Sequence, residues 1–299
     1  MEVEILLRKK RLMIGYLFLL PFLIHFSIFK IYPLFSSIYI SFTNWSLMTL
    51  KSDFVGVKNY VDVLSEPLFF TVVKNTLYYS VFCAAGVVVF GLVMALALNI
   101  DLKGIGIFRT AYYIPVVVDW VIVATVWMFL LDPSFGLINY LFRTWGMNTH
   151  QFLQDPNEAL PIITLSSIWK GVGYYAIFYL AGLQDIPDSL LEAAKIDGAT
   201  KWQRFRYVIV PHLAPVSLFV VIMATIGALK IFSQIYIMTK GGPARATTTI
   251  MYYFYEVAFG YMKMGKGATI AVIFTVFVFL IILIQRKVMG KMSGASGLN

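Results

Sequence analysis

The segment from Ile186 to Pro211, IPDSLLEAAKIDGATKWQRFRYVIVP, decides how the rest of the chain is interpreted. It is the one long segment that combines dense charge, two sets of helix-start residues and a glycine, and long apolar segments stand on both sides of it. If those apolar segments cross a bilayer, the polar segment between them lies outside it. The pattern predicts a polar helix–turn–helix that offers a docking surface to something outside the membrane.

Composition supports a membrane location for the apolar segments. Of the 299 residues, 60% are hydrophobic and 13% are charged, and the mean hydropathy is +0.79. Soluble domains carry roughly 25% charged residues. The chain is therefore a polytopic α-helical membrane protein. Its net charge of +9 comes from basic residues spread over short loops, which is typical of a membrane protein and argues against nucleic-acid binding.

Six segments are long and apolar enough to cross a bilayer, which takes about 20 residues. We expect one transmembrane domain over residues 1–299, in which the first span extends past Pro33 to Phe42. The six predicted spans are 12–32, 72–98, 108–131, 160–184, 212–238 and 267–285.

The distribution of lysine and arginine predicts the orientation. Six spans put both termini on one side, together with the loops 99–107 and 185–211. Thirteen basic residues lie on that side and nine lie on the other. Because basic residues are enriched on the cytoplasmic side, both termini and the loop 186–211 are expected in the cytoplasm.

The outer segments 43–71, 132–159 and 239–266 are too short for separate domains, and we expect them to form a rim. In the first of these, Phe54, Tyr60, Val61 and Leu64 have the spacing of a short surface helix.

Known catalytic, metal-binding and nucleotide-binding patterns are absent. Cys83 is the single cysteine, and His25, His150 and His212 are isolated, so neither a disulfide nor a metal site is expected. The segment GYMKMGKG, from Gly260 to Gly267, approaches a nucleotide-binding loop, but a glycine stands where Ser or Thr must bind magnesium. The chain is therefore not expected to be an enzyme, and any ATP that drives it is hydrolysed by another polypeptide.

Helix-capping residues shape the segment 186–211. Ser189 with Glu192, and Thr200 with Gln203, each have the spacing of a capping box, in which a hydroxyl and a side-chain carbonyl bind backbone donors at a helix start. Gly198 between them suits a left-handed helix end. We predict two short helices that meet at Gly198. An ordinary loop on the inner leaflet is the alternative interpretation.

These residues resemble the EAA motif of permease subunits in binding-protein-dependent ABC importers. The residues that match the motif are Glu192, Ala193, Ala194, Asp197, Gly198, Ala199, Trp202, Phe205 and Pro211. The resemblance extends over nearly the whole chain to the carbohydrate-permease branch. It includes Phe54-Val55-Gly56, Asn59-Tyr60, Asn75-Thr76, Phe108-Arg109, Pro115, Ile168 to Gly173, Gly182-Leu183-Gln184 and Gly241-Gly242-Pro243.

The resemblance implies a type I importer fold and a set of partners. Two permease subunits, the second usually a different chain, form the pore in the prokaryotic cytoplasmic membrane. Two cytoplasmic ATPases hold ATP and magnesium, so no cofactor is expected in this chain, and an extracytoplasmic binding protein delivers the solute. The EAA loop enters a cleft of the ATPase, with Trp202 and Phe205 anchoring it against the permease's own helices.

Ionisable residues within predicted spans are candidates for the solute path, because exposing them to lipid is costly. Asp119 and Lys170 lie at similar depths in the third and fourth spans, which allows them to pair, whereas Lys230 lies nearer the outer end and can reach the interface. The aromatic candidates are Trp169, Tyr174 and Tyr175, for which helix packing is the alternative role. Pro115 is expected to kink the third span.

Other functions fit the sequence less well. The solute expected from the resemblance is a sugar or oligosaccharide, and a polyol or glycerophosphodiester is the nearest alternative. A secondary transporter acting alone would need internal pseudo-symmetry, which is not apparent. A membrane-embedded enzyme would need a catalytic constellation, which the sequence lacks.

Overall fold

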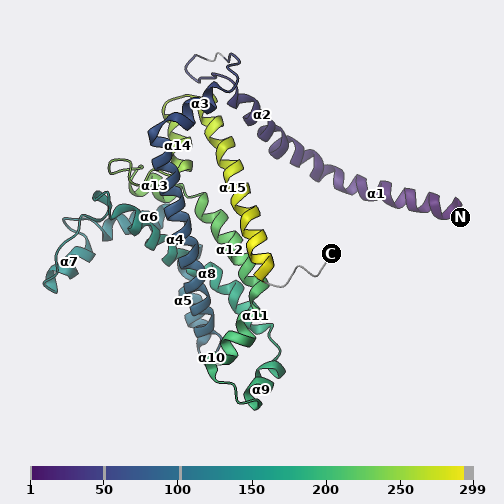
Figure 1. Cartoon of the computed structure of the whole chain (residues 1–299), viewed down its shortest axis with the longest axis vertical. Coiled ribbons are helices and arrows are strands. Elements are labelled where there is room, and N and C mark those ends of the chain that lie inside the picture. The colour runs from purple at the N-terminus through teal and green to yellow at the C-terminus, as the bar shows by residue number, and fades with distance from the viewer. Residues whose placement is uncertain (1, 50–51, 101–102, 293–299) are drawn as a thin grey trace. The chain divides into compact units, whose positions relative to one another are not determined.

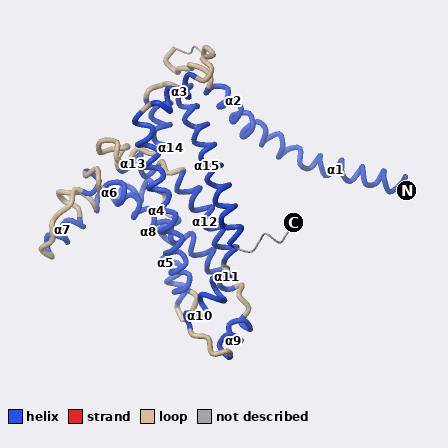
Figure 2. Tube along the Cα trace, viewed as in Figure 1, coloured by secondary structure: helices blue, strands red, loops and turns tan. Residues whose placement is uncertain are grey.

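The computed structural model describes residues 2–49, 52–100 and 103–292, and this part of the chain is helical with no β-strand (Figure 2). Its long helices are α1 (Glu2–Phe26), α4 (Pro67–Leu98), α8 (Ala159–Gln184), α12 (Ala214–Leu229) and α15 (Met264–Met292). The shorter helices are α2 (Tyr32–Ser41), α3 (Lys58–Ser65), α5 (Ile105–Val117), α6 (Trp120–Leu130), α7 (Leu137–Thr144), α9 (Asp188–Ile196), α10 (Lys201–Arg204), α11 (Val210–His212), α13 (Ser233–Met238) and α14 (Ile250–Tyr255). Single turns of other helix types are η1 (Ser27–Ile31), η2 (Phe152–Gln154), η3 (Phe205–Ile209) and η4 (Glu256–Gly260).

Five of the six predicted spans coincide with apolar helices. Within the described residues, four helices have the length and apolarity to cross a membrane, and the bent pair α5–α6 raises the number to five. The four are Met13–Ser41, Pro67–Leu98, Ala214–Met238 and Met264–Val288. The remaining prediction, 160–184, coincides with α8, which has 26 residues and carries Lys170, serines and glycines that lower its apolarity. Polar residues are tolerated there because much of α8 is buried by other helices.

Backbone contacts divide the chain into two compact units. The first comprises Met1–Ser65 and Phe254–Ile273, and the second comprises Glu66–Tyr253 and Phe274–Asn299. One boundary between the units, after Ile273, falls inside the helix α15, so this division does not separate two transmembrane domains. The single transmembrane domain over residues 1–299 stays a prediction.

Hydrogen bonds to the end of α2 organise the first unit. The Asn59 amide, on α3, donates to the carbonyls of Ser41 and Thr43 at 2.9 and 2.8 Å, and the Thr269 hydroxyl, on α15, also donates to Ser41. The predicted surface helix in the segment 43–71 is therefore present as α3, although Phe54 lies outside it.

Gly267 belongs to the segment GYMKMGKG, which was rejected as a nucleotide-binding loop. It packs closely on Ala258, since a Cβ atom added to Gly267 would stand 2.6 Å from the Ala258 methyl group.

The core of the second unit is formed by α4, α8 and α12, which lie side by side (Figure 1). One buried cluster includes Tyr79, Cys83 and Ile163 together with residues of α12 and α13, and α5 packs on α8. A second cluster, at the end that carries α9 to α11, includes Tyr179, Leu183 and Leu213. These two clusters set the positions of the polar groups described below.

The third span is broken between α5 and α6, and the expected kink at Pro115 is replaced by a bend at Val118 and Asp119. The two helices meet at 95° across Val118 and Asp119, whose backbones are extended. Pro115 therefore lies within α5, and the bend comes three residues after it. The Asp119 carboxylate accepts a hydrogen bond of 2.7 Å from the Val121 amide and caps the start of α6.

The Asn75-Thr76 pair, one of the segments that resemble the permease family, holds the loop that follows Gly241-Gly242-Pro243 in the second unit. The Asn75 amide, on α4, donates to the carbonyls of Arg245 and Thr248, each at 3.1 Å, and the Thr76 hydroxyl accepts from the Ile250 amide at 2.9 Å. The loop that they hold begins at the predicted turn Gly241-Gly242-Pro243, where Gly241 has a φ of +78°. Asn75 therefore fixes the loop between α13 and α14 to α4.

Replacement of Asn75 by alanine is expected to destabilise the second unit by about 1–3 kcal/mol, because two partly buried carbonyls lose their donor. Thermal unfolding of the protein in detergent measures the effect as a lower melting temperature. Lys74→Ala is the matched control, since Lys74 is exposed on the preceding position of α4. Equal melting temperatures for the two variants would show that the loop does not depend on Asn75.

Candidate functional site

A cavity of about 250 Å³ lies among α4, α5, α6, α8, α12 and α13. Its lining combines aromatic rings with polar side chains in the middle of apolar helices. The lining residues that carry polar or aromatic groups are Tyr79, Cys83, Trp120, Ser167, Lys170, Tyr174, Tyr175 and Gln234. Lys170 is only 7% exposed, although it carries the one ammonium group of the lining.

Lys170 contacts both sides of the break between α5 and α6. Its ammonium group donates to the Val116 carbonyl at 3.1 Å and lies 4.9 Å from the centre of the Trp120 ring. Val116 belongs to the last turn of α5, where carbonyls lack partners within the helix, and Trp120 is the first residue of α6. A cation at a helix C-terminus is also favourable for the helix dipole.

The predicted pairing of Asp119 with Lys170 is wrong. Both residues lie in the described part of the chain, and no ion pair joins them there. Asp119 is occupied as the cap of α6, and Lys170 uses a backbone carbonyl and a ring instead. Depth in a predicted span does not reveal that a new helix begins at Asp119, although an Asp before an apolar helix is also an N-cap signal.

The other path candidates divide into those that reach the cavity and those that do not. Tyr174 and Tyr175 line it with Lys170, as expected. Trp169 points elsewhere, with its ring 5.7 Å from that of Trp127 and half of its surface exposed. Lys230 caps the end of α12, where it is exposed. Cavity residues that sequence reasoning missed are Tyr79, Trp120, Ser167 and Gln234, which sit on four different helices and share no motif.

The segment 186–211 folds as two short helices around a glycine, as predicted. Gly198 has a φ of +77°, and the amides of Gly198 and Ala199 donate to the carbonyls of Lys195 and Ala194 at 3.1 and 2.9 Å. This pair of bonds is the Schellman arrangement, in which a left-handed residue closes a helix. The alternative of an unshaped loop is therefore wrong for this segment.

Only one of the two predicted capping boxes forms. The Thr200 hydroxyl accepts from the Gln203 amide at 3.2 Å, and the Gln203 side chain accepts from the Thr200 amide at 2.7 Å. At the start of α9, Pro187 occupies the cap position and makes no side-chain bond, so the predicted box of Ser189 with Glu192 is wrong. Pro187 caps the helix two positions before the predicted cap, which places Ser189 inside the helix.

Much of the loop's surface is exposed within this chain. Glu192, Ala193, Asp197 and Gly198 are exposed, while Ala194 and Ala199 are half-buried. Trp202 is 68% exposed, and its ring lies 5.4 Å from that of the half-buried Phe205.

Different residues from the expected pair attach the loop to the helices. Ile186 and Leu213 belong to the second buried cluster, and Leu191 and Ile209 pack against it. These four flank the loop on both sides, whereas Trp202 and Phe205 do not join the cluster. Aliphatic residues therefore attach the loop to this cluster, and the anchoring role of Trp202 and Phe205 stays a prediction.

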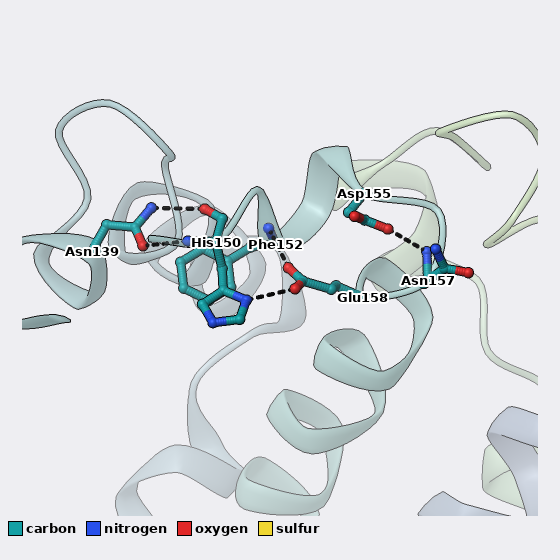
Figure 3. A network of polar contacts seen from close by, with 6 residues as sticks. All are labelled: Asn139, His150, Phe152, Asp155, Asn157 and Glu158. Carbon is teal, nitrogen blue, oxygen red and sulfur yellow. Dashed lines mark hydrogen bonds and ion pairs between the residues drawn. The ribbon is translucent and has the colours of Figure 1, made fainter. Parts of the chain in front are cut away.

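The outer segment 132–159 is held by a polar network (Figure 3). The buried Asn139 side chain binds both the amide and the carbonyl of His150, at 3.0 and 2.8 Å. Glu158 pairs with the His150 ring at 2.6 Å and accepts from the Phe152 amide at 2.8 Å. His150 is therefore not isolated, and the sequence does not reveal its partner because seven residues, including η2, separate it from Glu158.

Comparison with known proteins identifies the family. Residues 87–293 match the model of the binding-protein-dependent transport system inner membrane component. The chain belongs to this family. The match covers α8, the whole 186–211 loop and all of the cavity lining except Tyr79 and Cys83, so the family assignment rests largely on the same elements as the sites above.

Relatives of this inner membrane component align over almost the full length. The trehalose/maltose transport system permease protein MalF of Thermococcus litoralis is 34% identical over 285 residues, which are 94% of this chain and 95% of the relative. The sn-glycerol-3-phosphate transport system permease protein UgpA of Agrobacterium fabrum is 34% identical over 277 residues, 92% and 94% of the two chains.

Solved structures of an alginate transporter share the fold of this inner membrane component. A chain of a bacterial ABC transporter involved in the import of the acidic polysaccharide alginate superposes with a TM-score of 0.83, at 26% identity, over 95% of this chain and 97% of that one. The same transporter in complex with an alginate pentasaccharide-bound periplasmic protein gives a TM-score of 0.83 at 25% identity, over 95% and 96%. The ABC importer permease fold expected from the resemblance is confirmed.

The observed caps predict unequal effects of two similar substitutions. Thr200→Ala removes a cap that is present and is expected to cost about 1 kcal/mol of local helix stability, whereas Ser189→Ala removes none and is expected to leave α9 unchanged. Amide hydrogen exchange of the segment 186–211 measures both. Faster amide exchange in α9 of the Ser189→Ala variant would show that the capping box of Ser189 with Glu192 is present. It would contradict the cap at Pro187.

Proposed function

We propose that this chain is the transmembrane subunit of an ATP-driven importer and forms part of the path for a sugar or oligosaccharide. The cavity carries the proposal, because aromatic faces and scattered hydroxyl, amide and ammonium groups are what a polyhydroxylated solute needs in place of water. The polar lining is otherwise unexplained in the middle of apolar helices. The sugar assignment is further supported by the names of the maltose and alginate relatives.

The partners follow from the same proposal. A separate ATPase, which holds ATP and magnesium, binds the exposed loop formed by Glu192 to Ala199, and a second permease subunit completes the pore. A binding protein delivers the solute from outside, as the alginate transporter's complex with its periplasmic protein supports. Both termini and the loop face the cytoplasm of a prokaryote, and this chain itself carries no catalytic site.

A second solute class is favoured by two observations. UgpA relatives are named for glycerol-3-phosphate transport, and Lys170 places a cation in the cavity lining. A small phosphorylated polyol is therefore the alternative substrate.

Reconstituted uptake tests the proposed function. The chain is purified with the ATPase and permease that copurify with it and tested in vesicles against maltose, trehalose, alginate oligosaccharides and glycerol-3-phosphate, each with its binding protein. We expect ATP-dependent uptake of a sugar, reduced at least about tenfold by Gln234→Ala, because a buried polar contact to the solute is lost. Gln154→Ala is the control, since Gln154 is exposed in η2 and outside the cavity. Uptake without ATP by the chain alone would identify a secondary transporter and reject the proposal.

The conformation of Gly198 gives a separate test of the coupling loop. Valine at this position must adopt a left-handed backbone at a cost of roughly 1–2 kcal/mol, so Gly198→Val is expected to distort the turn and lower uptake and solute-stimulated ATP hydrolysis. Gly198→Asn tolerates the same backbone and is expected to remain close to the parent protein. The amount of protein in the membrane should be equal for both variants. Normal uptake and normal ATPase stimulation in Gly198→Val would show that the turn is not part of the coupling.

A further inference from the structure

The break between α5 and α6 lacks the backbone bonds that would fix its angle. Val118 and Asp119 have extended backbones, and the bond from the Val118 amide to the Ile114 carbonyl, at 3.4 Å, is the last that α5 makes. A continuous helix would need both residues to turn helical, and Asp119 would then give up its cap. The bent and straighter forms therefore compete, and contacts outside the break decide between them.

Lys170 makes two such contacts from a third helix. Through one ammonium group it binds the end of α5 at Val116 and the start of α6 at Trp120. Lys170 is nearly buried on α8, which glycine packing holds against α4 and α5.

The same side chain lines the solute cavity. Ser167, Tyr174 and Gln234 line that space with it. An oxygen atom of an entering solute is a hydrogen-bond acceptor that competes with the Val116 carbonyl for the ammonium group. Because a ligand shifts a conformational equilibrium only through contacts that differ between states, this competition links occupancy of the cavity to the angle of the break.

We propose that Lys170 is a positioning residue that holds the α5–α6 break in its bent form and releases it when solute oxygen atoms occupy the cavity. This role rests on the proposed function of the cavity, but it concerns the shape of the path rather than the identity of the solute. Loss of the charge-assisted hydrogen bond changes the ratio of bent to extended forms by about tenfold or more.

Spin labels on the two sides of the break measure its angle. The labels replace the exposed Ile107 on α5 and Phe129 on α6, in a Cys83→Ala background that removes the chain's single cysteine. With a rise of 1.5 Å per residue, the two backbone positions stand about 20 Å apart at a right angle and about 30 Å apart in a straight helix. Double electron–electron resonance on the assembled transporter in vesicles resolves these distances.

Lys170→Met is expected to move the distance distribution toward the longer value and to raise ATP hydrolysis in the absence of solute. Lys170→Arg, which keeps the charge and the donors, should retain the short distance. Lys230→Met is the matched control, because Lys230 is exposed at the end of α12 and outside the cavity, and it should leave the distribution unchanged.

Trp120→Leu provides a second variant that leaves the ammonium hydrogen bond in place. It is expected to give a smaller shift in the same direction, since only the ring contact is removed. A short distance in both Lys170→Met and Trp120→Leu would overturn the proposal, even if uptake were lost. Conversely, a lengthened distance in a complex that transports none of the tested sugars would support the positioning role and reject the proposed substrate.

Discussion

Close packing of α8 against its neighbours is the constraint on which the second unit depends. Helices in a bilayer gain little from hydrophobic burial against each other, so small residues that allow close approach do much of the work. A Cβ atom on Gly173 would stand 2.9 Å from the Tyr112 carbonyl of α5, and one on Gly171 would stand 3.1 Å from a methyl of Val87 on α4. Glycines on α8 therefore bring α4 and α5 near enough to surround the polar residues between them.

This packing explains why the cavity contains an ammonium group at all. Lys170 lies directly before Gly171, on a part of α8 that other helices cover, so its side chain reaches α5 and α6 rather than lipid. The break in the third span supplies the acceptor, because only an interrupted helix offers free carbonyls at this place. The polar lining and the broken helix thus depend on each other. A straight third span would leave Lys170 without the Val116 carbonyl.

Local chemistry was predictable from the sequence, whereas contacts between helices were not. The position of five apolar helices, the Gly198 turn and the Thr200 capping box follow from composition and from residues a few positions apart. The pairing of Asp119 with Lys170 failed because depth in a predicted span says nothing of a break in it. The cavity residues Tyr79 and Gln234 lie far apart in the sequence, and only the fold brings them together.

The same distinction applies to the segment 186–211, where two kinds of interaction have separate roles. Its shape comes from short-range hydrogen bonds at Gly198 and Thr200, whose donors and acceptors all lie within the segment itself. Its attachment comes from Leu191 and Ile209, which pack on the cluster around Tyr179 that α4, α8 and α12 share. Under the proposed function, this arrangement gives a displacement at the exposed surface of the segment a route to α8 through the apolar contacts of Leu191 and Ile209, without any need for the loop to refold.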